Sequence, residues 1–195
     1  MNLVERAKSI IFKPSETWMA VKTEQTTVKE LFVSYAAILA LIPAVASFIG
    51  MSLIGTSMMG IHFRIPILSG IVHLILSYIL SLVGVYVMAF IIDALAPSFN
   101  SRKDMLAAVK LAVFSFTPAW IGGIFMIIPM LGILTLLASL YGLYVLYVGL
   151  PIMMETPRDK TLGYFVVIIV ISIVVSIIIN VIARLALPSG PMMMP

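Results

Sequence analysis

The stretch PILSGIVHLILSYILSLVGVYVMAFII, residues 66–92, decides the fold because it contains no Asp, Glu, Lys or Arg. A helix needs roughly 20 apolar residues to cross about 30 Å of hydrocarbon. In lipid, backbone polar groups must find partners within their own segment, and an α-helix provides them. These residues therefore predict a membrane-spanning helix.

Four further apolar runs accompany this one, and together they place most of the chain in lipid. The chain has 195 residues, of which 62% are hydrophobic and 10% charged, whereas a soluble domain is about 45–50% apolar and about 25% charged. The runs predict five membrane helices, at residues 31–55, 66–92, 105–129, 131–154 and 163–187. We therefore expect an all-α fold, a polytopic membrane helical bundle preceded by a short amphipathic N-terminal arm. Its predicted parts are the arm at 1–30, the transmembrane domain at 31–187 and a short tail at 188–195.

The charged residues are confined to a few places, and this distribution predicts the orientation. All of them except Arg64 and Arg184 lie in residues 1–30, 93–110 and 155–160. Because Lys and Arg are enriched on the cytoplasmic side of membrane proteins, we expect the N-terminus in the cytoplasm and the C-terminus outside. The net charge of +4 fits anionic lipid headgroups at the cytoplasmic face, and no basic soluble domain is present to bind nucleic acid.

The N-terminal arm has the pattern of a helix with one apolar face. Apolar residues recur with helical spacing at Leu3, Val4, Ala7, Ile10 and Ile11, and the polar residues Glu5, Arg6, Lys8 and Ser9 lie opposite. Pro14 ends this helix and suits the first turn of a second one, which carries Trp18 as a candidate anchor in the membrane interface. The arm either lies flat in the interface or packs on the cytoplasmic face of the protein itself, and the two arrangements are compatible.

The sequence offers few groups for chemistry. It has no Cys, which excludes thiol catalysis and Cys-ligated metals. It contains no HExxH motif, no Gly-x-Ser-x-Gly motif and no phosphate-binding glycine loop. We therefore expect a protein that is not an enzyme and that binds no cofactor or metal.

Asp93 and Lys110 are the charged residues expected to lie closest to the hydrocarbon, where charge is costly and often functional. In a structural interpretation they form an ion pair, or the Lys110 side chain extends to the headgroups. In a functional interpretation they belong to a path for ions or protons.

Two stripes of polar residues run along the second and fifth predicted helices. Each stripe has a spacing of four residues, Ser69, His73, Ser77 and Ser81 in one and Ser172, Ser176, Asn180 and Arg184 in the other. Such stripes either hydrogen-bond across a helix bundle or line a water-filled path. His73 is the group here that titrates near neutral pH. The candidate intramembrane polar site therefore comprises His73, Ser77, Asp93, Lys110 and Asn180.

Two prolines inside predicted helices are candidate hinges. We expect Pro43 to kink the first helix and Pro118 to break the hydrogen-bond ladder of the third. Such breaks form substrate sites in transporters, but they are also ordinary kinks. On the fourth helix Tyr141, Tyr144 and Tyr147 recur every third residue, which indicates a packing surface with hydroxyls inside the bundle.

Short motifs along almost the whole chain resemble the bacterial Yip1-domain family. They are Asn2 to Lys8; Pro14, Glu16, Thr17 and Trp18; Thr117 to Trp120; Tyr141 to Tyr144 with Gly149 to Pro151; and Thr156, Pro157, Asp159, Lys160, Gly163 and Tyr164. The resemblance implies a five-span protein of the bacterial cytoplasmic (inner) membrane.

These observations lead to two hypotheses about function. The first is a non-enzymatic membrane protein that organises the membrane or acts as a scaffold, assembly or trafficking factor, either as a homo-oligomer or with other membrane proteins. The alternative is a transporter or channel for an ion or small solute, with a path near His73, Asp93 and Lys110. A hydrated cavity in mid-membrane would favour transport, whereas a centre packed with Ala, Gly and Ser would favour the scaffold.

Overall fold

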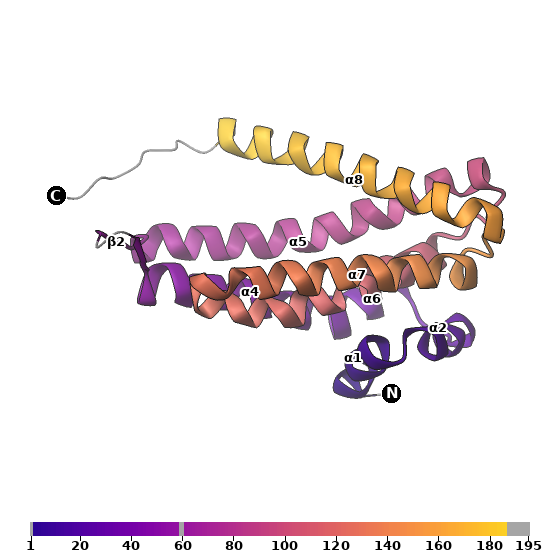
Figure 1. Cartoon of the computed structure of the whole chain (residues 1–195), viewed down its shortest axis with the longest axis horizontal. Helices are drawn as coiled ribbons and strands as arrows, with labels where there is room; N and C mark the ends of the chain where they lie inside the picture. Colours follow the sequence, from indigo (N-terminus) through magenta and orange to yellow (C-terminus); the bar gives the residue numbers. More distant parts are fainter. Residues whose placement is uncertain (1, 59–60, 187–195) are drawn as a thin grey trace.

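The structure is a bundle of five long helices with a two-helix arm beside one end (Figure 1). This computed structural model describes the backbone of residues 2–58 and 61–186 and the side chains of residues 2–55 and 64–178. The helices long and apolar enough to cross a membrane are Val28–Ile54, Ile67–Phe99, Met105–Ile127, Pro129–Met153 and Arg158–Ile178. The predicted all-α bundle of five spans is therefore confirmed.

The arm consists of α1, Leu3–Phe12, and α2, Pro14–Thr23. Asn2 caps α1 by accepting a hydrogen bond from the backbone N–H of Val4 at 3.3 Å, which satisfies an N–H that has no partner within the helix. Pro14 stands at the first position of α2, where its missing N–H costs nothing.

The first span is a composite of α-helical and π-helical segments. It comprises α3, Val28–Leu31; η1, Phe32–Ala36; α4, Ala37–Phe48; and η2, Ile49–Ile54. Thr27 caps its start, and its hydroxyl accepts the backbone N–H of Glu30 at 3.2 Å. The Glu30 carboxylate accepts from the Thr26 hydroxyl and not from the Thr27 backbone, so this cap is not a full capping box.

The remaining spans follow with short connections. A hairpin of β1, Thr56–Met58, and β2, Ile61–Phe63, leads to α5, Ile67–Leu95, and η3, Ala96–Phe99. Next come α6, Met105–Gly122, then η4, Gly123–Ile127, and η5, Pro129–Leu131. The last two helices are α7, Gly132–Met153, and α8, Arg158–Ala186.

Helix α6 is the centre of the bundle. Within its most apolar window 72% of residues are buried, compared with 17–33% for the other four spans. The small residues Ala36, Ala40 and Ala44 of the first span are buried, as expected for a stripe that lets helices approach closely. The outer helices therefore present apolar faces to their surroundings, and α6 is enclosed by them.

Neither proline interrupts its helix. Pro43 lies inside α4, and Pro118 lies inside α6, which continues as an α-helix to Gly122. The expectation that Pro118 breaks the third helix is wrong, because packing on all sides keeps α6 helical around the missing hydrogen bond. The departures from α-helical geometry lie elsewhere, in the π segments of the first span and in η4.

Candidate functional site

Lys110 holds the arm on the central helix. It belongs to α6 and is only 4% exposed. Its ammonium donates to the backbone oxygen of Val21 at 2.9 Å and to that of Glu24 at 2.6 Å. These carbonyls lie at the C-terminal end of α2, which carries partial negative charge and lacks helical partners. The arm therefore supplies hydrogen-bond acceptors to the buried ammonium, and the ammonium supplies donors to the carbonyls at the end of α2.

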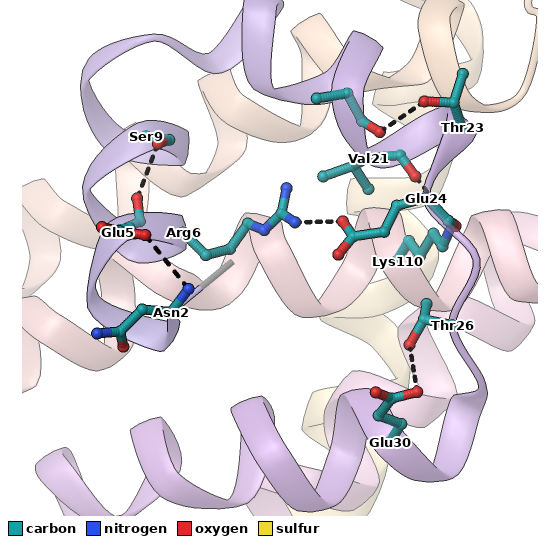
Figure 2. A network of polar contacts seen from close by, with 11 residues as sticks. Asn2, Glu5, Arg6, Ser9, Val21, Thr23, Glu24, Thr26, Glu30 and Lys110 are labelled. Carbon is teal, nitrogen blue, oxygen red and sulfur yellow. Dashed lines mark hydrogen bonds and ion pairs between the residues drawn. The ribbon is translucent and has the colours of Figure 1, made fainter.

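A buried arginine reinforces this contact from the other helix of the arm. The guanidinium of Arg6, on α1, donates to the carboxylate of Glu24, and Figure 2 shows it reaching across from α1 to the segment after α2. The same guanidinium lies 5.7 Å from the centre of the Phe114 ring of α6, within the range of a cation–π contact. Two cations, Arg6 and Lys110, thus gather around Glu24 beneath the arm.

Trp18 is the main apolar contact of the arm. Its side chain is fully buried, and its indole N–H donates to the Val145 oxygen of α7 at 3.1 Å. Gly149 makes room for the ring, because a Cβ there would lie 2.7 Å from Trp18 Cε2. Contrary to the expectation of an anchor in the membrane interface, Trp18 is therefore buried, since the bundle offers its side chain both a pocket and a hydrogen-bond acceptor.

Tyr141 of α7 makes a second link to the arm. Its hydroxyl donates to the backbone oxygen of Ile11 at 2.5 Å. The rings of Tyr144 and Tyr147 pack against Tyr141 and against Phe165 of α8, as the predicted packing surface requires. The two side chains are nevertheless 51% and 39% exposed, so they are not enclosed by the bundle. A spacing of three residues rotates each side chain about 60° around the helix, so the stripe turns by about 120° from Tyr141, which contacts the arm, to Tyr147, which contacts α8.

A second ionic cluster ties the arm to the links between helices. Glu155 accepts from Lys22 at 2.8 Å and lies 3.6 Å from Arg102, which also pairs with Asp104 at 3.2 Å. The hydrogen bond and charge of Lys22, with a further contribution from Arg102, hold the pKa of Glu155 below its usual value. Glu155 is exposed, so water screens this cluster more than the Lys110 contact.

Asp93 and Lys110 do not form the predicted ion pair. Among the described side chains, Lys110 is bonded to the arm, whereas one carboxylate oxygen of Asp93 is buried without a hydrogen-bond partner. Asp93 lies near Tyr164 of α8, whose hydroxyl donates to the neighbouring Ile92 oxygen. The surroundings of the two charges differ because Lys110 is on α6, which lies under the arm, whereas Asp93 is near the end of α5, beside α8.

The other predicted site residues are not assembled with Lys110. His73 is exposed on the outer surface of α5, and Ser77 donates to the Leu74 oxygen of its own helix at 3.0 Å. The side chain of Asn180 lies outside the described residues. In the part of the chain with described side chains, no hydrogen bond or ion pair joins His73, Asp93 and Lys110 to one another, and no three His, Asp or Glu form a candidate metal site.

Sequence reasoning missed the roles of Arg6 and Glu24 in this site. The helical pattern placed Arg6 on the polar, solvent-facing side of α1, but it is 7% exposed. A helix that packs on a protein can bury polar residues when partners such as Glu24 and Phe114 are in reach. The run Asn2 to Lys8 and the residues Trp18 and Gly149, all motifs of the resemblance, were the available signal.

Both buried cations of this site make structural contacts. The ammonium of Lys110 and the guanidinium of Arg6 are both engaged in structural contacts, so neither is free to act on a substrate in this conformation. The charged residues that remain exposed on the arm, such as Lys8 and Lys13, lie at its outer surface.

Comparison with known proteins gives the chain a family context. The profile of the Yip1 domain matches residues 8–179. Two relatives, each named inner membrane protein YohC, come from Escherichia coli K12 and Escherichia coli O6:H1. Each is 23% identical to this chain over 155 residues, which make up 77% of this chain and 80% of the relative. No solved structure matches the chain.

Proposed function

The chain belongs to the Yip1 domain family, and on that premise we propose that it works by binding, as a non-enzymatic scaffold or assembly factor of the bacterial inner membrane. The family match confirms the resemblance found in the motifs. The observation that carries the proposal is the arm, which Lys110 and Arg6 fasten to the central helix through buried polar contacts. A fastened arm presents a defined surface, which a scaffold requires.

The exposed surface of the arm fits the lipid–water interface. Phe12 and Met19 are 78% and 59% exposed, although both are large and apolar. The arm lies beside the bundle, at the end where α5 finishes and α8 begins (Figure 1). We place this end in the cytoplasm, where Phe12 and Met19 enter the headgroup region and Lys8 and Lys13 meet anionic lipid.

The outer helices supply the second binding surface. Large apolar side chains stay exposed along α5, α7 and α8, including Ile79, Leu136 and Ile173 at 49%, 54% and 53% exposure. Lipid covers most such faces, and helices of a second copy or of other membrane proteins cover the rest. The scaffold role therefore needs protein contacts at some of these positions.

In-membrane photocrosslinking tests the scaffold role. A photoreactive residue at Ile79, Leu136 or Ile173 is expected to yield crosslinks to a second copy or to a recurrent membrane protein. The same residue at Val113 of α6, which is fully buried, is the matched control and should yield crosslinks only within the chain. If the exposed positions crosslink to lipid alone, and vesicles containing the protein keep their shape, the scaffold proposal is wrong.

A further inference from the structure

A cavity of about 180 Å³ lies between α5, α6 and α8. It is separate from the arm and from the Lys110 contact. Residues of three helices line it, among them Ser81, Gly84, Met88, Phe116, Ser172 and Ser176. The serines come from the two polar stripes of the sequence, one on α5 and one on α8, so the fold brings the stripes together at this cavity and leaves His73 outside it.

The cavity lies at the middle of the membrane-spanning bundle. Ser81 is the midpoint of α5, and Ser172 is the midpoint of α8. Phe116 is the midpoint of the span Met105–Ile127. A hydroxyl at this depth has no access to headgroups or bulk water, so its hydrogen bonds must come from the protein or from a molecule inside it.

Two of the hydroxyls that line the cavity, those of Ser81 and Ser172, have capacity for further hydrogen bonds. Ser81 accepts the indole N–H of Trp120 at 3.0 Å, which leaves its own O–H as a donor. The Ser172 hydroxyl is buried and makes no hydrogen bond with the protein. Leaving it so costs about 1–3 kcal/mol, and a hydrogen-bonding molecule in the cavity that Ser172 lines would offset this cost.

Glycine at position 84 keeps the cavity open. A Cβ added to Gly84 would meet no atom within 4 Å. Gly84 therefore differs from Gly122 and Gly149, where the added Cβ would lie within 3 Å of a packed neighbour. Close helix packing explains those two glycines but does not explain Gly84.

We propose that this cavity is a mid-membrane binding site for water and for uncharged hydrogen-bonding molecules of similar size. Its volume exceeds the roughly 10–15 Å³ that one water requires, and three serines supply the 2–4 polar partners that a buried water needs. The described residues that line it include no charged side chain, so it does not stabilise ions. The scaffold role does not require this site, and either proposal can fail without the other.

Thiol reactivity tests for water at this depth. The chain has no Cys, so Ser172→Cys carries the only thiol, and Ile173→Cys, on the lipid-exposed side of the same turn, is its matched control. N-ethylmaleimide reacts with the thiolate, which forms only where water is available. In liposomes Ser172→Cys should react at least about tenfold faster than Ile173→Cys. Lipid around the control thiol raises its pKa, and a rise of one unit lowers the thiolate population tenfold.

A second pair and a filling variant complete the test. Ser176→Cys with Ile177→Cys repeats the comparison one turn away, should Ser172→Cys fail to fold. Adding Gly84→Leu to Ser172→Cys should fill the cavity and slow its reaction to the rate of Ile173→Cys. Gly132→Leu, where an added Cβ also meets nothing within 4 Å, should leave the rate unchanged. Equal rates for the serine and isoleucine positions in folded protein, or no effect of Gly84→Leu, would overturn the proposal.

Discussion

At the scale of single residues, Lys110 shows how a membrane protein can bury a charge at little cost. An ammonium inside the bundle loses its hydration, and it is tolerated because the Val21 and Glu24 carbonyls at the end of α2 replace that hydration. Arg6 is held in the same way by Glu24 and Phe114. Each partner comes from another part of the chain, so the arm and α6 stabilise each other.

Lys110→Met should release the arm while leaving the five spans folded. Two carbonyls lose a charged donor, and we expect a cost of about 1–3 kcal/mol. The change should expose Trp18, measured as increased quenching of tryptophan fluorescence by aqueous iodide. Lys8→Met, which removes an exposed ammonium of α1, is the control and should leave quenching as in the unmodified protein. Equal quenching in both variants would show that Lys110 does not hold the arm.

Gly149→Ala should disturb the pocket of Trp18. The added Cβ would lie 2.5 Å from Leu111 Cδ1 and 2.7 Å from Trp18 Cε2, and overpacking of this kind costs about 1–3 kcal/mol. The midpoint of thermal unfolding in detergent should fall. Gly132→Ala on the same helix meets no atom within 4 Å and should not lower it. A midpoint unchanged by Gly149→Ala would mean that the arm shifts without loss of stability.

At the scale of elements, two of the links between helices are joined to each other and to the arm by polar contacts. Glu155 adopts a left-handed backbone conformation with φ 52°, and its carboxylate joins Lys22 of the arm to Arg102 of the link before α6. The backbone N–H of Arg102 donates to the Met154 oxygen at 2.8 Å. The arm, the α5–α6 link and the α7–α8 link therefore form one connected surface.

Acid should weaken this surface. The folded-state pKa of Glu155 is lowered by Lys22 and then Arg102, so its stabilising effect is present above the usual carboxyl pKa and is lost as pH falls through the lowered value. Glu155→Gln should lower the unfolding midpoint slightly at pH 7, and this difference should shrink as the pH falls below the usual carboxyl pKa. Gln keeps the Cβ, so backbone strain is the same in both proteins.

The control for this prediction is the partner variant. In a Lys22→Gln, Arg102→Gln background, Glu155→Gln should have no further effect at pH 7, because the charges that lower its pKa are gone. A full effect of Glu155→Gln in that background would assign its role to something other than the two cations.

At the scale of the whole molecule, charge is concentrated at one end of the bundle. The eight Asp and Glu residues lie in or just after the arm, at the start of the first span, or where α5 and α7 end and α6 and α8 begin. The Lys and Arg residues lie in the same places, except Arg64 and Arg184. An odd number of spans places the end of α8 at the opposite end from the arm, as Figure 1 shows.

Topology reporters should place the arm in the cytoplasm. Green fluorescent protein fused to the N-terminus should fluoresce in a bacterial host, and alkaline phosphatase fused to the C-terminus should be active, because it forms its disulfides only outside the cytoplasm. The reciprocal fusions should be inactive or dark. The opposite pattern would reverse the orientation and would remove the arm from the anionic leaflet in which we place it.

Much of this fold could be predicted because the free energies that decide it depend on residues close together in the sequence. Whether a segment enters lipid depends on the summed transfer free energy of its own residues, so five apolar runs were enough to predict five spans. The start of the first span at Thr27 was equally local, since a cap involves residues three positions apart. The exact ends of α5 and α8 were less predictable, because apolar and polar residues mix there.

The candidate site was decided by tertiary structure. Lys110 bonds to a residue 89 positions away, Trp18 to one 127 away and Tyr141 to one 130 away, and no local pattern contains such pairs. The sequence by itself determined that the chain spans a membrane five times with its charge on one side. Only the packing of the arm on α6 decided which charges are buried, and only the packing of α8 beside α5 and α6 decided which serines share a cavity. The physical reason is that burial and hydrogen bonding depend on neighbours that the folded chain supplies.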